Sequence, residues 1–154
     1  MSDDTSSRDE NPEGWGSHKP ALRAIARFTP IRSVIEFGAG IHSSSLFLSK
    51  GFPLLESLIS FEHDGSWAQR VRNNDPRHTL IVIPTVEFEA RSAGMKADFV
   101  FLDSGGDRFS LVRHCLTLAP IFAIHDCQDG ELDSYGFKYV IGFNSKIQTV
   151  FASN

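Results

Sequence analysis

This chain has little cysteine and no long apolar run, and its first residues do not predict a leader segment. Cys115 and Cys127 are the only cysteines among 154 residues, too few for a disulfide framework. No apolar run approaches the length of a membrane span, and the first residues carry neither the basic nor the apolar segment of a secretory signal. These absences argue against a disulfide-stabilised scaffold and a membrane partner, and we expect a cytoplasmic protein.

The chain also lacks an excess of basic charge. Its formal net charge is −4, and its 41% hydrophobic and 22% charged content is typical of one soluble globular domain. Residues 1–14 hold five acidic side chains against one basic side chain. We expect a disordered acidic tail there, followed by a single domain over residues 15–154. The charges of the remainder balance at zero, so no footprint for DNA or RNA is predicted.

Short apolar runs alternate with helical patterns along the chain. Strands are predicted over residues 33–37, 57–61, 79–83, 98–102, 121–124, 138–143 and 147–152. Helices are predicted over residues 19–28, 43–50, 67–73 and 108–118, with shorter ones over 87–96 and 128–137. This alternation implies a parallel sheet, and the last two strands must be antiparallel neighbours because only residues 144–146 separate them. The expected fold is a Rossmann-like three-layer α/β sandwich: a mostly parallel seven-stranded sheet ending in an antiparallel hairpin, of minimal size and without a substrate cap.

A glycine turn follows the first predicted strand. Gly38 and Gly40 lack a Cβ atom, so the turn can be tight and a ligand can approach its backbone. Residues 43–45 are all serine and are expected to cap the next helix, whose first amides would face that ligand. Glu36 precedes the turn, and its carboxylate would repel a phosphate but attract a cation. The turn therefore favours S-adenosylmethionine, with its ammonium and sulfonium charges, over a dinucleotide.

Polar side chains follow the ends of the predicted strands. The carboxyl ends of parallel strands meet at one edge of a sheet, where ligands bind. The residues at these ends are Glu36, Glu62, Asp103, His125 and Asp126. Any one of them could instead cap the helix that follows it. Glu62 lies 24 residues after Gly38, the spacing of an acid that accepts both ribose hydroxyls; the alternative is a surface acid that opens a helix at Gly65.

Four features in register resemble class I S-adenosylmethionine-dependent methyltransferases. Residues 33–44 (SVIEFGAGIHSS) resemble their motif I, residues 61–64 (FEHD) the acidic loop after their second strand, and residues 97–103 (ADFVFLD) their fourth-strand motif. The final hairpin resembles their strands six and seven. The resemblance covers residues 18–154 and implies that S-adenosylmethionine is the cofactor.

Carried over residue by residue, the resemblance implies a role for each matching position. The implied contacts are the methionine portion for Glu36, Gly38, Ala39 and Gly40, the ribose for Glu62, the adenine for His63, and the methyl-transfer site for Asp103. Trp67 would either cover an adenine face or anchor its helix to the core. Residues 15–18 (WGSH) resemble a segment that some small methyltransferases fold over the cofactor, although a helix N-cap at Ser17 or His18 explains them as well.

The sequence after the fourth strand bears on the methyl acceptor. Residues 103–106 (DSGG) stand where many base-amino methyltransferases carry a sequence like Asn-Pro-Pro-Tyr, which argues against methylation of adenine or cytosine nitrogen. An oxygen nucleophile must lose a proton, and His125 beside Asp126 is the candidate base, with a loop-capping histidine as the alternative. Asp103, Asp126 and Gln128 could instead share a divalent cation, which we rank below a metal-free site.

Other interpretations stay open at this point. With no segment for a cap, either the unidentified acceptor is large or a second subunit of a homodimer completes the pocket wall. A non-catalytic S-adenosylmethionine- or nucleoside-binding scaffold of the same fold would carry the same motifs. A nicotinamide-dependent oxidoreductase is less favoured, because it would want glycine at position 43, no acid at position 36, and a catalytic domain.

Overall fold

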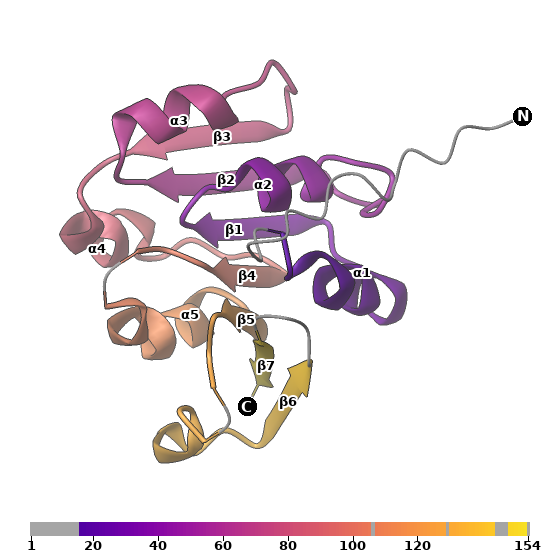
Figure 1. Cartoon of the computed structure of the whole chain (residues 1–154), viewed down its shortest axis with the longest axis vertical. Coiled ribbons are helices and arrows are strands. Elements are labelled where there is room, and N and C mark those ends of the chain that lie inside the picture. Colours follow the sequence, from indigo (N-terminus) through magenta and orange to yellow (C-terminus); the bar gives the residue numbers. More distant parts are fainter. Residues whose placement is uncertain (1–15, 106, 129, 144–147, 154) are drawn as a thin grey trace, which may run out of the picture.

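The computed structural model describes residues 16–105, 107–128, 130–143 and 148–153. The predicted tail, Trp15 and the hairpin turn at 144–146 lie outside these ranges. Seven strands form one sheet in the order β3-β2-β1-β4-β5-β7-β6 (Figure 1). Their bounds are β1 Ser33–Phe37, β2 Ser57–Glu62, β3 His78–Val82, β4 Phe99–Leu102, β5 Ile121–His125, β6 Tyr139–Phe143 and β7 Thr149–Ser153.

The strand directions are those that the sequence predicts. Neighbouring strands from β3 through β5 are parallel, whereas β7 is antiparallel to both β5 and β6. β6 is the outer strand, and Tyr139, Val140 and Ile141 are exposed along it. The sequence-based prediction of a mostly parallel sheet with a terminal antiparallel hairpin is therefore confirmed. The homodimer that the missing cap suggests stays a prediction.

Helices cover both faces of the sheet (Figure 1). They are α1 Lys19–Phe28, α2 Ile41–Phe47, α3 Gly65–Val71, α4 Phe88–Ser92 and α5 Val112–Leu118, with 3-10 turns η2 Thr85–Glu87, η3 Arg108–Leu111 and η4 Asp133–Tyr135. Side chains alternate along a strand, so Val34 packs with α1 and α2, and the adjacent Ile35 packs with α4 and α5. Burial on both faces explains why the parallel strands read as unbroken apolar runs.

Several predicted helix bounds differ from the structure. The structure begins α2 at Ile41 with Gly40 as its N-cap and no side-chain capping bond, so the predicted serine cap is wrong. Asp64 caps α3 by accepting the N–H groups of Ser66 and Trp67, and the helix ends at Val71, before the predicted end at Asn73. The helix predicted over 108–118 divides into η3 and α5, and the described residues of the predicted helix 128–137 form the short turn η4 and no longer helix.

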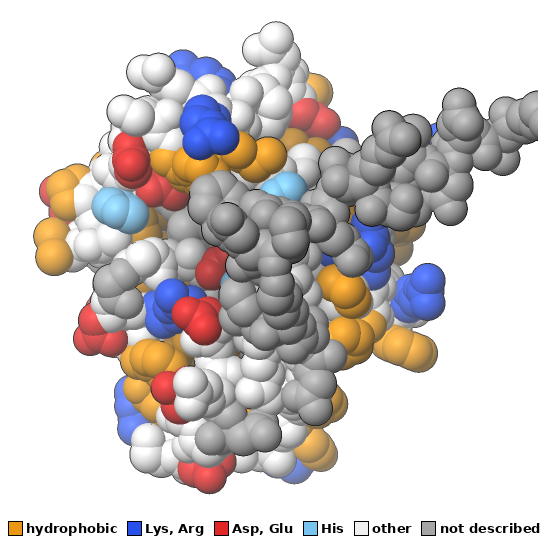
Figure 2. All heavy atoms as spheres, viewed as in Figure 1, with side chains coloured by type: hydrophobic (Ala, Val, Ile, Leu, Met, Phe, Trp, Pro, Cys, Tyr) orange, Lys and Arg blue, Asp and Glu red, His pale blue; other side chains and the backbone are white. Residues whose placement is uncertain are grey.

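Two surface properties bear on partners. On the face shown in Figure 2, the acidic and basic side chains of the described residues are interspersed. Among the helices of the described ranges, none has the length and apolar character needed to cross a membrane.

Candidate functional site

A cavity of about 270 Å³ lies at the carboxyl ends of the central strands. Its walls come from the segment before α1, the glycine turn after β1, α3, and the chain that follows β4 and β5. The lining residues are Gly16, His18, Gly40, Ile41, His42, Trp67, Asp103, Arg108, His125 and Asp126. This is the sheet edge at which the sequence predicts the ligand.

The cavity gathers half of the predicted site residues. Gly40, Trp67, Asp103, His125 and Asp126 line it, whereas Glu36, Gly38, Ala39, Glu62 and His63 do not. The lining residues that had no predicted role are Gly16, His18, Ile41, His42 and Arg108. Gly16 and His18 lay in the segment that resembles a fold-over segment, and Ile41 and His42 lay in the stretch that resembles motif I, whereas Arg108 lay in neither.

Glu36 is buried behind the glycine turn, with 0% of its surface exposed. Its carboxylate accepts hydrogen bonds from the hydroxyls of Ser43 (2.5 Å), Ser44 (2.6 Å) and Ser60 (2.6 Å). Ser60 is its register partner on β2, and the other two serines belong to α2. Glu36 thus ties β1 to β2 and α2 and holds the turn from within, and the serines that read as helix caps are its donors.

Burial raises the pKa of Glu36 from 4.5 to about 7, although its serine hydrogen bonds oppose the shift. Between these values the folded protein keeps a proton that the unfolded chain releases, so the free energy of unfolding falls as pH rises through this window. The loss is on the order of 3 kcal/mol. We expect Glu36→Gln to gain about that much relative to wild type between pH 4.5 and pH 8, as measured by urea unfolding. Ser44→Ala should instead lose stability relative to wild type as pH rises, because it removes a hydrogen bond to the charged form of Glu36. If the difference in unfolding free energy between Glu36→Gln and wild type does not change with pH, the prediction is refuted.

Glu62 stands at the end of β2 with its side chain 5% exposed. Its Oε1 accepts the N–H groups of His63 (2.7 Å) and Asp64 (2.8 Å), and the Nδ1 of His63 lies 3.0 Å away. Within the described ranges its other oxygen, Oε2, accepts no hydrogen bond. Asp64, and not Glu62, caps the helix that follows. The Oε2 atom of Glu62 is therefore left to bind a ligand.

Trp67 joins α3 to the glycine turn. Its indole Nε1 donates to the carbonyl oxygen of Ala39 at 2.7 Å, and the guanidinium of Arg70 lies 4.7 Å from its ring centroid. The side chain is half-buried and lines the cavity. The anchoring role is therefore present, and the ring also contributes to the cavity wall.

Arg108 connects the acidic residues of the cavity. Its Nη1 lies 3.6 Å from Oδ1 of Asp103, and its Nη2 lies 3.6 Å from Oδ2 of Asp126. Nη1 also donates to the carbonyl oxygen of His125 at 2.6 Å. Burial raises the pKa of Asp103 to about 7 even though Arg108 opposes the shift. Asp126 has φ 56°, the only positive φ of a non-glycine residue in the described ranges, which places a strained backbone at the site.

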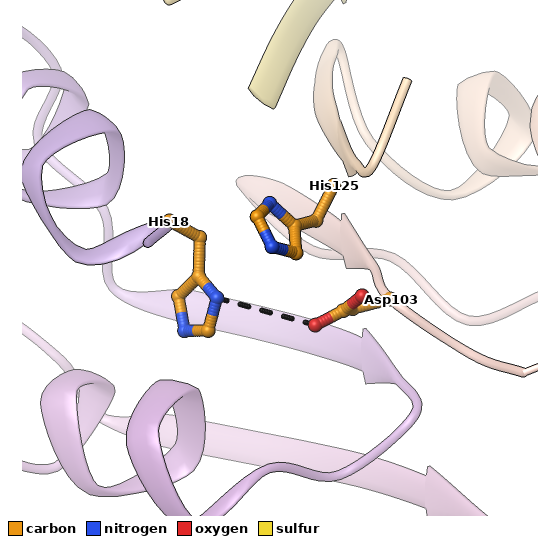
Figure 3. Close-up of side chains that lie close together, drawn as sticks. All are labelled: His18, Asp103 and His125. Carbon is orange, nitrogen blue, oxygen red and sulfur yellow. Dashed lines mark ion pairs between the residues drawn. The ribbon is translucent and has the colours of Figure 1, made fainter. Parts of the chain in front are cut away.

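Two histidines of the cavity lining lie beside each other, with Asp103 next to them (Figure 3). The rings of His18 and His125 have centroids 4.9 Å apart, and Nδ1 of His18 lies 4.0 Å from Oδ2 of Asp103. His125 has Thr149 Oγ1 at 2.9 Å from its Nδ1 and Ser17 Oγ at 3.2 Å from its Nε2. Burial lowers the pKa of His18 to about 3 and that of His125 to about 4, so both rings are neutral at pH 7.

Comparisons with known proteins agree with this architecture. No family model matches the sequence, and no curated protein matches it. Among solved structures, a putative O-methyltransferase from Klebsiella pneumoniae matches with a TM-score of 0.68 at 18% identity, over 96% of this chain and 83% of the other. An O-methyltransferase from Bacillus cereus in complex with S-adenosylhomocysteine matches with a TM-score of 0.66 at 13% identity, over 96% and 84%. The chain has the class I methyltransferase fold.

This methyltransferase fold does not by itself select a reaction. A spermidine synthase from Thermotoga maritima also matches, with a TM-score of 0.65 at 15% identity over 92% of this chain and 60% of the other. Identities this low establish the fold alone. The function must therefore be argued from the residues of the cavity.

Proposed function

We propose that this protein transfers a methyl group from S-adenosylmethionine to an oxygen nucleophile. The observation that carries the proposal is the layout of the cavity. Gly40 of the glycine turn and Trp67 come from the half of the sheet that holds β1 and β2, whereas Asp103, His125 and Asp126 stand at the ends of β4 and β5. A cofactor held by the first set of residues would present its reactive carbon to the acid–base residues of the second set.

The residues present fit this cofactor. A Cβ atom on Gly40 would lie 2.5 Å from the hydroxyl of Ser43, and one on Gly16 would lie 3.2 Å from the His42 ring, so neither position has room for a side chain and both backbones can line the cavity closely. The backbone from Gly38 to Gly40 would hold the methionine portion, with Glu36 supporting it from behind. The free Oε2 of Glu62 would accept ribose hydroxyls, and the adenine would lie near His63 and Trp67.

The bound cofactor would supply an electrophilic methyl carbon, whose bond electrons stay with the sulfur when the acceptor oxygen takes the methyl group. The protein must align that oxygen and remove its proton. The neutral His125 ring can take the proton at Nε2, because its Nδ1 faces Thr149. Arg108 lies between Asp103 and Asp126 and offsets part of their negative charge.

The proposal is tested first by calorimetric titration of the whole chain with S-adenosylmethionine, S-adenosylhomocysteine and NADH. Micromolar binding of both sulfur nucleosides without NADH supports it, and a screen of hydroxyl acceptors for S-adenosylhomocysteine release then tests turnover. Binding without turnover on any acceptor would favour a scaffold of the same fold. Binding of NADH alone would overturn the cofactor assignment.

Glu62→Ala is expected to weaken the affinity for S-adenosylmethionine by about 1–3 kcal/mol, because it removes the carboxylate assigned to the ribose hydroxyls. Calorimetric titration measures the change directly. Glu56→Ala is the matched control: Glu56 is exposed, does not line the cavity, and pairs with Arg32. If the two variants bind S-adenosylmethionine with equal affinity, the assignment of Glu62 to the cofactor site is wrong.

A further inference from the structure

Three side chains from distant parts of the sequence converge at one side of the cavity. His18 lies just before α1, Asp103 follows β4, and His125 ends β5 (Figure 3). One nitrogen or oxygen atom from each lies within 4.8 Å of the others. Such convergence of two imidazoles and a carboxylate needs a reason beyond local secondary structure.

His18 supplies an independent observation. The residue is only 4% exposed, and within the described ranges neither of its ring nitrogens has a hydrogen-bond partner. Burying a ring nitrogen without a partner costs about 1–3 kcal/mol. No described protein group relieves that cost, although the nitrogen Nδ1 faces the carboxylate of Asp103 at 4.0 Å. A ligand shared with Asp103 would relieve it at Nδ1.

His125 is oriented as a ligand from behind. Its Nδ1 lies 2.9 Å from the hydroxyl of Thr149, which is 0% exposed. Metal-binding histidines characteristically make such a bond through the other ring nitrogen, which fixes the ring and its tautomer. The contact leaves Nε2 as the ligating atom of His125, and an ion there would take the place of the Ser17 hydroxyl, which now lies 3.2 Å from this nitrogen.

We propose that His18, Asp103 and His125 bind one divalent transition-metal ion, with Zn²⁺ as the first candidate. Imidazole nitrogens suit zinc, iron, nickel and copper, whereas Mg²⁺ and Ca²⁺ take oxygen ligands. A tetrahedral zinc ion holds its ligand atoms roughly 3.4 Å apart, so small side-chain rotations close the site. Three protein ligands leave one position open for another molecule.

The neighbouring charge is compatible with this ion. Arg108 approaches Oδ1 of Asp103, whereas His18 faces Oδ2. The guanidinium and the ion therefore use different oxygens of one carboxylate. This site also differs from the all-oxygen site that Asp103, Asp126 and Gln128 could form, because Gln128 does not line the cavity.

The chemical consequence rests on the proposed function. The open position would take the hydroxyl of the acceptor, and a bound divalent cation lowers the pKa of such an oxygen toward neutrality. His125 would then act as a ligand, and the proton would leave to solvent or to Asp126. The substrate class named in this way is a small molecule or side chain with an accessible hydroxyl group.

The test uses the full chain, freed of metal by a chelator and titrated with Co²⁺ and Zn²⁺ in the absence of cofactor. We expect one equivalent of Co²⁺ to give visible ligand-field bands, Zn²⁺ to displace it, and Mg²⁺ to leave the bands unchanged. His18→Gln and Asp103→Asn should each weaken Zn²⁺ binding by at least about tenfold, and Thr149→Val by about 10–100-fold. His114→Gln is the matched control, because His114 lies on α5 and contacts Ser92 instead.

Two readouts keep the result unambiguous. If a variant does not fold, NMR of the wild type tests the same contacts. Addition of Zn²⁺ should then shift the resonances of the ring nitrogens of His18 and His125. Absence of Co²⁺ and Zn²⁺ binding, or equal binding by wild type and His18→Gln, would overturn the site. Because these titrations contain no cofactor, failure of S-adenosylmethionine binding would count against the proposed function and leave the metal site standing.

Discussion

Gly38→Ala is expected to lower the free energy of unfolding by about 4 kcal/mol or more. Gly38 has φ +88°, a backbone conformation that an L side chain rarely adopts. A Cβ atom there would also lie 2.5 Å from the carbonyl oxygen of Asp103 and 2.6 Å from Cα of Ser104. These neighbours are backbone, so the clash can be relieved only by moving the turn after β1 away from the end of β4.

Two other glycines separate the sources of this effect in urea unfolding. Gly94 has φ +80° but no atom within 4 Å of its Cβ position, so Gly94→Ala should cost about 1 kcal/mol from backbone strain alone. Gly65 has neither feature and begins α3, so Gly65→Ala should be neutral or slightly stabilising. If Gly38→Ala cost no more than Gly94→Ala, the close packing of the turn against Asp103 would be refuted.

That packing also shows what a sequence can predict about this site. Gly38, Gly40 and Asp103 stand at strand ends, and parallel pairing of β1 with β4 brings those ends together by a general rule. The strand pattern and the terminal hairpin were predictable because alternation of apolar runs is a local property. The glycine turn and part of the cavity lining could therefore be named before the structure was known.

The role of Glu36 was not predictable in this way. Ser43 and Ser44 follow a glycine turn, which is the pattern of a helix cap, and only tertiary packing shows that their hydroxyls point to Glu36. Ser60 completes the set from the next strand, through a register that no local pattern specifies. A buried acid with three donors stabilises the turn, whereas the sequence alone suggested direct contact with a cation.

His18 shows the same limit more strongly. The neighbouring Ser17 contacts His125 across 108 residues of sequence, and this contact places the His18 ring beside β5. Arg108 is similar, since it reads as an ordinary helix residue and yet bridges Asp103 and Asp126. Contacts of such long range depend on the assembled sheet. The part of the cavity that holds the acid–base residues Asp103, His125 and Asp126 was therefore only partly predictable.

The chemistry assigned to that part of the cavity predicts a large kinetic effect. His125→Ala should lower kcat by about 10²–10⁴-fold, the contribution of a positioned group that removes a proton, while the affinity for S-adenosylmethionine stays close to that of wild type. Release of S-adenosylhomocysteine with a hydroxyl acceptor measures the first quantity, and calorimetry measures the second. His114→Ala should leave both unchanged, because His114 does not line the cavity.

The same variant also separates a base from a metal ligand. If His125 acts only as a base, treating wild type with a chelator should leave kcat unchanged, and the loss in His125→Ala stands alone. If it binds the ion proposed above, the chelator should reproduce most of that loss in wild type, and added Zn²⁺ should restore the wild type but not the variant. A His125→Ala protein that folds, binds the cofactor and turns over at the wild-type rate would exclude both roles, because either one makes this ring essential for activating the acceptor oxygen.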